Sequence, residues 1–330
     1  MIGPATGVRI GITGLGTNVP AKVMTNDDMA AFVDTSDEWI RERTGIKERR
    51  IATQEEALSD IALPAVREAL AEAGADPSEI DLVICATVTP DMLFPTTSAL
   101  MADTLGMRNA AAYDLLAGCT GFMYAVAQAY GMLASGLSKK ALVVGGDLLS
   151  KILDWDDRST LVLFGDGAGA VVMEPVDHGG FLGFELGADG GGGEHLQLPG
   201  SGSRRFEHPE QMLKMNGREV YKFATRVLVS SAEAVLAECG RTIDEVDVYV
   251  PHQANKRIID HAVGKLGVPR ERTVVNVDRF GNTSSGSIPL ALADARADGR
   301  LHDGALVLMT GMGAGLTWGS ALLEWTGTQS

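Results

Sequence analysis

The order of apolar and polar residues along the chain predicts an α/β protein. Apolar runs at Leu82 to Ala86, Ala110 to Leu116 and Val246 to Val250 have the length and composition of buried strands. A similar run at Val274 to Val277 predicts another strand. The segment from Phe122 to Leu133 is longer and rich in alanine, methionine and aromatic residues, so it favours a buried helix.

One helix-turn-strand pattern occurs twice. Ala69 to Gly74, followed by Glu79 to Ile84, matches Val235 to Gly240, followed by Glu245 to Val250, at a constant offset of 166 residues. Each copy has an amphipathic helix that ends at glycine, an Asp-containing turn and a buried strand, as in an α/β unit. Chance similarity is the alternative, but the offset is close to half of the 330 residues.

The turn around Cys119 corresponds to the turn around Ser285 at nearly the same spacing. We therefore expect two stacked α/β halves, residues 1–176 and 177–330, which meet where Pro175 and the glycines after it interrupt the pattern.

Composition narrows the class of protein. The net charge of −15 argues against a nucleic-acid partner. No window approaches the roughly 18 uninterrupted apolar residues of a membrane span, and residues 1–16 lack the basic and apolar regions of a signal peptide. Three cysteines, an odd number, argue against a disulfide framework. We expect a cytoplasmic protein with no membrane association.

Neither a cofactor nor a metal is indicated. Gly14-Leu-Gly16 lacks the third glycine of a dinucleotide fingerprint, and Gly165 to Gly169 has the wrong spacing for one. The six histidines and three cysteines show no metal-binding spacing.

Cys119, His252 and Asn282 form the candidate catalytic set. Each stands on a turn next to glycine or proline, at the end of a predicted strand. Cys119 also precedes a predicted helix, whose N-terminal N–H groups and dipole favour a thiolate. A single buried cysteine or histidine is more often structural, as we expect for Cys85 and Cys239, but the combination favours a nucleophilic site.

Several longer motifs resemble one family. Gly118-Cys119-Thr-Gly121, Pro251-His252-Gln-Ala-Asn255 and Gly281-Asn282-Thr-Ser look like the active-site segments of β-ketoacyl-acyl-carrier-protein synthase III. The likeness continues in Thr35 to Ile46, Phe164 to Gly169 and Gly311 to Ser320. It implies a thiolase-like fold with a five-layered α/β/α/β/α core, and a homodimer.

The resemblance also implies an activity, in which an acyl-CoA starter condenses with malonyl-acyl-carrier protein to start type II fatty acid synthesis. A thiolate can accept the acyl group and later release it. Neutral imidazole N–H and carboxamide NH₂ groups can stabilise the enolate that forms when the malonyl group loses CO₂. The alternatives are a specialised synthase of a polyketide or quinolone pathway, and a non-catalytic acyl-CoA-binding subunit.

Further site residues follow from the resemblance alone. The oxyanion hole would be formed by the backbone N–H groups of Cys119 and Ala314. Coenzyme A would be the substrate carrier and not a cofactor, and the expected contacts are Trp39, Arg43, Arg158, Gly217, Tyr221, Lys222, Ala254, Asn255 and Arg257. The expected acyl pocket consists of Phe94, Leu149 and Met312, where a methionine in place of a frequent phenylalanine leaves the starter open.

A basic stripe predicts the docking site of the carrier protein. Lys214, Arg218, Lys222 and Arg226 recur every four residues, as do Arg257, His261 and Lys265, so each set occupies one helix face. Residues 203–272 carry 12 basic and 10 acidic side chains in an otherwise acidic chain. A solvated helix face is the ordinary explanation. Beside the predicted site, the stripe favours docking of an acidic carrier through Lys222, Arg257 and Lys265.

Overall fold

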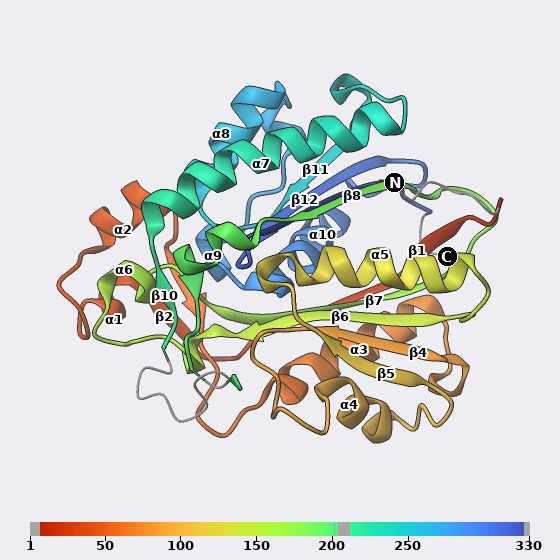
Figure 1. Cartoon of the computed structure of the whole chain (residues 1–330), viewed down its shortest axis with the longest axis horizontal. Coiled ribbons are helices and arrows are strands. Elements are labelled where there is room, and N and C mark those ends of the chain that lie inside the picture. The colour runs from red at the N-terminus through yellow and green to blue at the C-terminus, as the bar shows by residue number, and fades with distance from the viewer. Residues whose placement is uncertain (1–6, 201, 204–211, 327–330) are drawn as a thin grey trace.

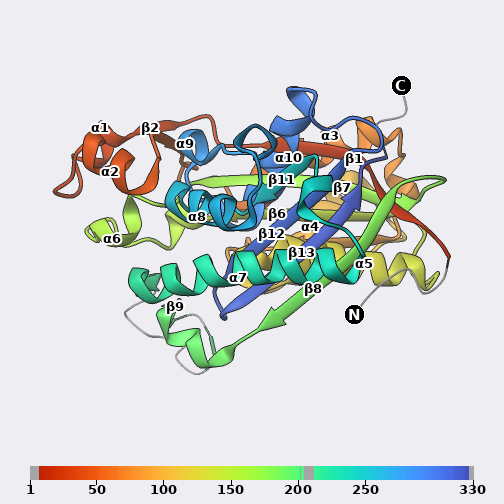
Figure 2. The same cartoon turned by 90° about the horizontal axis from the view of Figure 1, so that it is seen from above.

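The computed structural model describes residues 7–200, 202–203 and 212–326, and it contains two large β-sheets with helices between and outside them (Figure 1, Figure 2). The first sheet has the strand order β1-β7-β6-β4-β5, and the second has the order β11-β12-β13-β8. The strands are β1 Ile10–Asn18, β4 Leu82–Ala86, β5 Ala111–Leu115, β6 Ala141–Leu148, β7 Asp166–Pro175, β8 Gly180–Ala188, β11 Val248–Pro251, β12 Leu306–Gly313 and β13 Thr317–Glu324.

The helices form three layers around the two sheets. α5 and α10 lie between the sheets, α3 and α4 pack on the outer side of the first sheet, and α7 and α8 pack outside the second (Figure 1). This is the α/β/α/β/α order that the family resemblance implies. The helices are α3 Leu58–Ala73, α4 Thr97–Leu105, α5 Gly121–Ala134, α7 Gly217–Glu238, α8 Lys256–Leu266 and α10 Ser287–Ala297.

Shorter elements surround the site end of the molecule. α2 and α6 lie beside the N-terminal end of α7 and α8 (Figure 1, Figure 2). The short elements are β2 Val23–Thr25, α1 Asn26–Met29, α2 Asp37–Thr44, β3 Glu48–Arg50, α6 Arg158–Leu161, β9 Leu196–Gln197, β10 Lys214–Met215 and α9 Val277–Phe280.

The predicted duplication is visible in the element boundaries. α3 and a 3₁₀ turn at Pro77–Glu79 precede β4, and α7 and a 3₁₀ turn at Ile243–Glu245 precede β11. The turn Gly118–Thr120 leads into α5, just as the turn Ser284–Gly286 leads into α10. One core cluster contains buried side chains from both halves. The division at residue 176 therefore stays a prediction, although it lies in the connection between β7 and β8.

Two strand predictions need correction. β5 forms as predicted, but it is not buried: within the described part of the chain it is an edge strand that pairs only with β4, and Leu116 just beyond it is 77% exposed. The strand predicted at Val274 to Val277 does not form. Thr273 makes one isolated bridge with Tyr249, and Val277 already begins α9.

No helix within the described ranges is long and apolar enough to cross a bilayer.

Candidate active site

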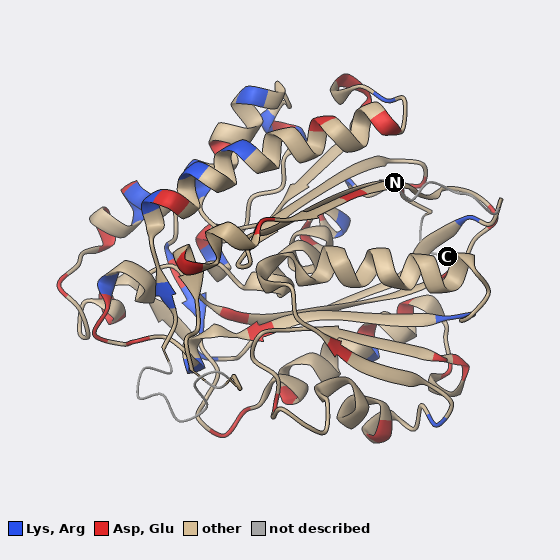
Figure 3. Cartoon of the chain, in the orientation of Figure 1, with Lys and Arg blue, Asp and Glu red and all other residues tan. Residues whose placement is uncertain are grey.

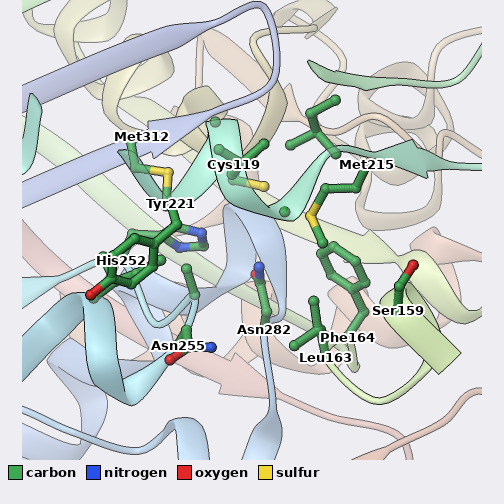
Figure 4. Close-up of a pocket in the computed structure, with 16 residues that line it drawn as sticks. Cys119, Ser159, Leu163, Phe164, Met215, Tyr221, His252, Asn255, Asn282 and Met312 are labelled. Atoms are coloured by element: carbon green, nitrogen blue, oxygen red, sulfur yellow. The ribbon is translucent and has the colours of Figure 1, made fainter. Parts of the chain in front are cut away.

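Cys119, His252 and Asn282 meet around one cavity of about 210 Å³ (Figure 4). Cys119 lies on the turn between β5 and α5, His252 follows β11 directly, and Asn282 lies between α9 and α10. The cysteine comes from the first half of the chain and the other two side chains from the second. The cavity thus lies where the two halves join.

Glycines bring the cysteine turn against the loop after β12. Gly118 has a φ of 58°, and a Cβ there would lie 2.7 Å from the backbone nitrogen of Ala314. A Cβ on Gly313 would lie 2.5 Å from the backbone nitrogen of Cys119. Larger residues at either position would force the two backbones apart. The Thr317 hydroxyl spans the contact, 3.0 Å from the Ala117 carbonyl oxygen and 2.9 Å from that of Ala314.

Opposing influences act on the pKa of the Cys119 thiol. Burial raises the pKa of Cys119 to about 11, and the Asp147 carboxylate adds to the rise. The Ser284 hydroxyl and the backbone N–H groups of Cys119 and Ala314 act in the opposite direction. The sequence indicates only the influences that favour a thiolate, and burial outweighs them.

His252 is a neutral donor in this site. Burial lowers the pKa of His252 to about 4, so the imidazole is uncharged at pH 7. Its Nδ1 lies 2.5 Å from the Ser287 Oγ, which also accepts a hydrogen bond from the Gln253 N–H at 3.4 Å. Among the described contacts of Ser287, Nδ1 is the one acceptor for the hydroxyl proton. With the hydroxyl donating to Nδ1, the proton of the neutral ring resides on Nε2.

The amide of Asn282 is oriented by a backbone donor. The Ser284 N–H donates to Asn282 Oδ1 at 2.9 Å, and both residues are buried. Since Oδ1 is the acceptor of this bond, the NH₂ group remains as the donor toward the cavity that Asn282 lines.

The predicted oxyanion donors lie next to the nucleophile. The backbone N–H groups of Cys119 and Ala314 both act on the Cys119 sulfur. Their role with a bound acyl group stays a prediction. Among the described residues no cluster of three or more metal-ligating side chains occurs.

The predicted coenzyme A contacts divide into two groups. Gly217, Tyr221, Ala254 and Asn255 line the cavity. Asn255 also caps α8, because its Oδ1 accepts the Arg257 N–H at 2.8 Å.

The remaining predicted contacts lie outside the cavity lining. The guanidinium groups of Arg43 and Arg158 lie 4.9 and 4.8 Å from the centre of the Trp39 ring. Arg257 lies 5.8 Å from the ring centre of Tyr221, and Lys222 forms an ion pair of 2.7 Å with Glu219.

Two of the three residues predicted for the acyl pocket do not line this cavity. Met312 lines the cavity beside Cys119 (Figure 4). Leu149 packs into a core cluster behind Phe164, and Phe94 is 83% exposed on the loop between β4 and α4. The sequence argument missed the apolar lining residues Leu163, Phe164, Leu196, Met215, Val220 and Ile258 and the polar lining residue Ser159. A signal existed for Phe164, which begins one of the resembling motifs.

Basic residues outnumber acidic ones on the first turns of α7 and on α8, whereas α2 carries both signs (Figure 3). Lys222, Arg257 and Lys265 are all exposed. Residues 204–211 of the segment predicted to be basic lie outside the described residues.

Comparison with known proteins shows the family. Residues 113–190 match the family described as 3-oxoacyl-[acyl-carrier-protein] synthase III, and residues 236–325 match the C-terminal part of the same synthase. The β-ketoacyl-[acyl-carrier-protein] synthase III of Symbiobacterium thermophilum is 54% identical over 96% of this chain and 98% of its own length. That of Desulfitobacterium hafniense strain DCB-2 is 50% identical over 97% and 98% of the two chains.

Solved structures agree. The synthase III of Thermus thermophilus has a TM-score of 0.92 at 50% identity and covers 97% of this chain and 100% of its own. The priming β-ketosynthase of the R1128 polyketide pathway has a TM-score of 0.92 at 38% identity, with 98% of each chain covered.

The layered fold and the match to these structures define a thiolase-like condensing enzyme. At this identity and coverage, the chain belongs to the β-ketoacyl-acyl-carrier-protein synthase III family, and it is an acyltransferase of the condensing type.

Proposed function

We propose that the protein condenses an acyl-CoA starter with malonyl-acyl-carrier protein, releasing CO₂ and coenzyme A and giving a 3-oxoacyl-carrier protein, the step that starts type II fatty acid synthesis. The observation that carries this proposal is the cavity in which a thiol, a neutral imidazole and a carboxamide converge from three distant segments.

In the first half-reaction, the Cys119 sulfur attacks the thioester carbon of the acyl-CoA, and coenzyme A leaves as the thiol. The negative oxygen of the tetrahedral intermediate accepts hydrogen bonds from the N–H groups of Cys119 and Ala314. These two groups already act on the sulfur, which supports the assignment.

In the second half-reaction, malonyl-acyl-carrier protein loses CO₂ and forms an enolate. The Nε2–H of His252 and the amide NH₂ of Asn282 donate to its oxygen. Because the pKa of His252 is about 4, this donor is a neutral imidazole at working pH. A neutral imidazole N–H is a far weaker acid than an imidazolium, so it donates a hydrogen bond to the enolate oxygen and keeps its proton. The enolate carbon then attacks the acyl thioester, and the Cys119 thiolate leaves.

The substrate carriers would approach from the end of α7 and α8. Tyr221, Ala254 and Asn255 line the route to Cys119, and the cluster of Trp39, Arg43 and Arg158 offers an aromatic face and positive charge for the nucleotide part of coenzyme A. Carrier docking on Lys222, Arg257 and Lys265 remains part of the proposal, supported by their exposure beside the cavity.

We also propose a homodimer in the cytoplasm. The unpaired edge of β5 lies next to exposed Leu116, and Leu93 and Phe94 are exposed on the loop after β4. Exposed apolar groups at a sheet edge suit a second copy of the chain. Cys85, Cys119 and Cys239 are all free thiols, which fits a reducing compartment.

The polyketide alternative is less well supported, because the R1128 priming synthase is 38% identical while the synthase III relatives reach 54%. A non-catalytic subunit would have no need of three converging polar groups.

The test is a two-stage incubation. The protein is mixed with a panel of short straight and branched acyl-CoAs, the adduct is located by peptide mass spectrometry, and malonyl-acyl-carrier protein is then added. We expect an acyl group on Cys119 that is converted into 3-oxoacyl-carrier protein, and no adduct on Cys119→Ser. If none of the acyl-CoAs in the panel gave an adduct on Cys119, the proposal would be refuted.

A further inference from the structure

Asp147 is a buried carboxylate beside the active site that the proposed mechanism does not use. It lies near the end of β6 with no exposed surface. Its Oδ1 accepts hydrogen bonds from the Val88 N–H at 2.7 Å and from the hydroxyls of Thr87 at 2.9 Å and Thr89 at 3.2 Å. Its Oδ2 accepts the Ser285 N–H at 3.2 Å.

These partners fit an ionised carboxylate. The N–H groups of Val88 and Ser285 can only donate, and they approach different oxygens. Burial raises the pKa of Asp147, and the surrounding donors oppose the rise. A buried carboxylate that accepts hydrogen bonds from four donors is held in one position.

The hydrogen bond from the Ser285 N–H connects Asp147 to the turn Ser284–Gly286, which makes two contacts at the active site. The Ser285 hydroxyl donates to the carbonyl oxygen of Gly118, the residue before the nucleophile, at 3.1 Å. The N–H of the neighbouring Ser284 donates to Asn282 Oδ1 at 2.9 Å. The turn thus contacts both the residue before the nucleophile and the amide donor.

The turn itself is in an unfavourable conformation. Ser284 has a φ of 51°, and it is the single non-glycine residue with positive φ in the described part of the chain. In the first half the equivalent position is Gly118, where glycine adopts a φ of 58° without a side-chain penalty. Ser284 must therefore be held in place by its surroundings.

We infer that Asp147 is a positioning residue for the condensation: its carboxylate holds the Ser284–Ser285 turn, and through that turn it fixes both Asn282 and the backbone of the Cys119 turn. This inference rests on the proposed function, since it concerns the same two half-reactions.

The charge of Asp147 supplies a readout that a purely structural residue would lack. Asp147 is a charged side chain that acts on the Cys119 thiol, while His252, which lines the cavity, is neutral above about pH 4. Removing the negative charge should make the thiolate easier to form. The same change should impair condensation, because an asparagine amide can retain the bonds at Oδ1 but turns its NH₂ group toward the Ser285 N–H.

The experiment compares Asp147→Asn with the wild type and with Asp166→Asn. Asp166 is also fully buried, but the hydrogen bonds it accepts come from Ser150 and Ala52 and not from the Ser284–Ser285 turn. Three quantities are measured: thermal unfolding, the rate of Cys119 alkylation by iodoacetamide between pH 7 and pH 9, and the rate of condensation.

For Asp147→Asn we expect condensation to fall about 10- to 100-fold from misplacement of the reacting groups, while alkylation at pH 8 rises about 3- to 10-fold. Asp166→Asn should lose stability but keep the wild-type alkylation rate. Condensation within twofold of wild type in a folded Asp147→Asn protein would overturn the inference. Equal losses in both variants with unchanged alkylation would also overturn it.

Ser285→Ala tests the same connection without touching the buried charge, and it decides the matter if Asp147→Asn does not fold. Loss of the bond to the Gly118 carbonyl should lower condensation about 10-fold and leave the alkylation rate unchanged. If Asp147→Asn does not fold and Ser285→Ala condenses at the wild-type rate, the inference is overturned. Wild-type acylation and condensation, run in parallel, test the proposed function separately.

Discussion

At the scale of single residues, the tautomer of His252 depends on Ser287. The serine hydroxyl reaches Nδ1 at 2.5 Å and has the Gln253 N–H as a second partner. Through this contact the ring presents Nε2–H toward the cavity, as a donor to the enolate requires. Ser287 lies 35 residues from His252 in sequence, and nothing in the residue pattern could have indicated the contact.

Ser287→Ala should therefore impair condensation more than acyl transfer. Without the hydroxyl, Nδ1 has no donor and the two neutral tautomers compete. We expect condensation to fall about 10- to 100-fold, as is common when a partner that orients a histidine is lost, while the acyl adduct on Cys119 forms as in wild type. Equal losses in both half-reactions, measured by product formation and by mass spectrometry, would remove the tautomer role.

The lowered pKa of His252 predicts a pH dependence of stability. The folded pKa is about 4 and the unfolded value is near 6.5, so the unfolded chain binds more protons between these limits. Stability from neutral His252 is complete above about pH 6.5 and decreases as the pH falls toward 4. Urea unfolding should show a loss of about 2 kcal/mol from this group between pH 7 and pH 5. His252→Asn should lack that part of the loss, and an identical loss in the variant would contradict the assignment.

At the scale of elements, the active site depends on the contact between the turn before α5 and the loop after β12. Gly313→Ala would place a methyl group 2.5 Å from the Cys119 backbone nitrogen. The two oxyanion donors would then separate, and the rate of acyl transfer should fall about 100-fold or more, as expected when such a donor is lost.

Gly131→Ala is the matched control, because Gly131 lies inside α5 with nothing within 4 Å of an added Cβ. It should keep full activity and gain up to about 1 kcal/mol of stability. If the two variants had similar acylation rates, the backbone contact would not position the oxyanion donors.

Much of the element order could be predicted from the sequence, because the repeated helix-turn-strand pattern is a local signal. The helix predicted to end at Gly74 does end there, and Gly74 adopts a left-handed conformation with a φ of 60°. The errors arose where tertiary context decides. Burial of β5 depends on whether another strand lies beside it, and Val274 to Val277 resembles a strand in composition but meets only one isolated bridge.

How well the residues of the site could be predicted also depended on whether the signal is local or long-range. Cys119, His252 and Asn282 could be named because each stands on a turn with its own motif. Asp147 and Ser287 could not, since they are ordinary residues whose importance comes from contacts between distant segments. Phe94 and Leu149 were carried over from the family motif, and in this chain neither lines the cavity.

At the scale of the whole molecule, charge is distributed unevenly in a way that suits an acidic carrier. The chain has a net charge of −15, yet basic residues outnumber acidic ones on the first turns of α7 and on α8 (Figure 3). Opposite charges on two proteins accelerate their encounter, and salt weakens the effect.

Lys265→Ala should therefore raise the apparent KM for malonyl-acyl-carrier protein and weaken the salt dependence of the rate. Lys265 is exposed on α8 and lies outside the cavity lining. A small malonyl thioester without a protein carrier should be used equally well by variant and wild type. Lys139→Ala, on an exposed lysine before β6, is the control and should change neither parameter. Equal losses with both malonyl donors would refute carrier docking at this position.

The most direct test of the central claim separates the two half-reactions on one thiol. His252→Ala and Asn282→Ala are each incubated with an acyl-CoA, examined by peptide mass spectrometry, and then mixed with malonyl-acyl-carrier protein. We predict that both variants carry the acyl group on Cys119 and retain it after the addition, with condensation reduced about 100- to 1,000-fold, whereas the wild type discharges it into product. Failure of both variants to form the adduct, or discharge at the wild-type rate, would contradict the assignment of Cys119 to acyl transfer and of His252 and Asn282 to condensation.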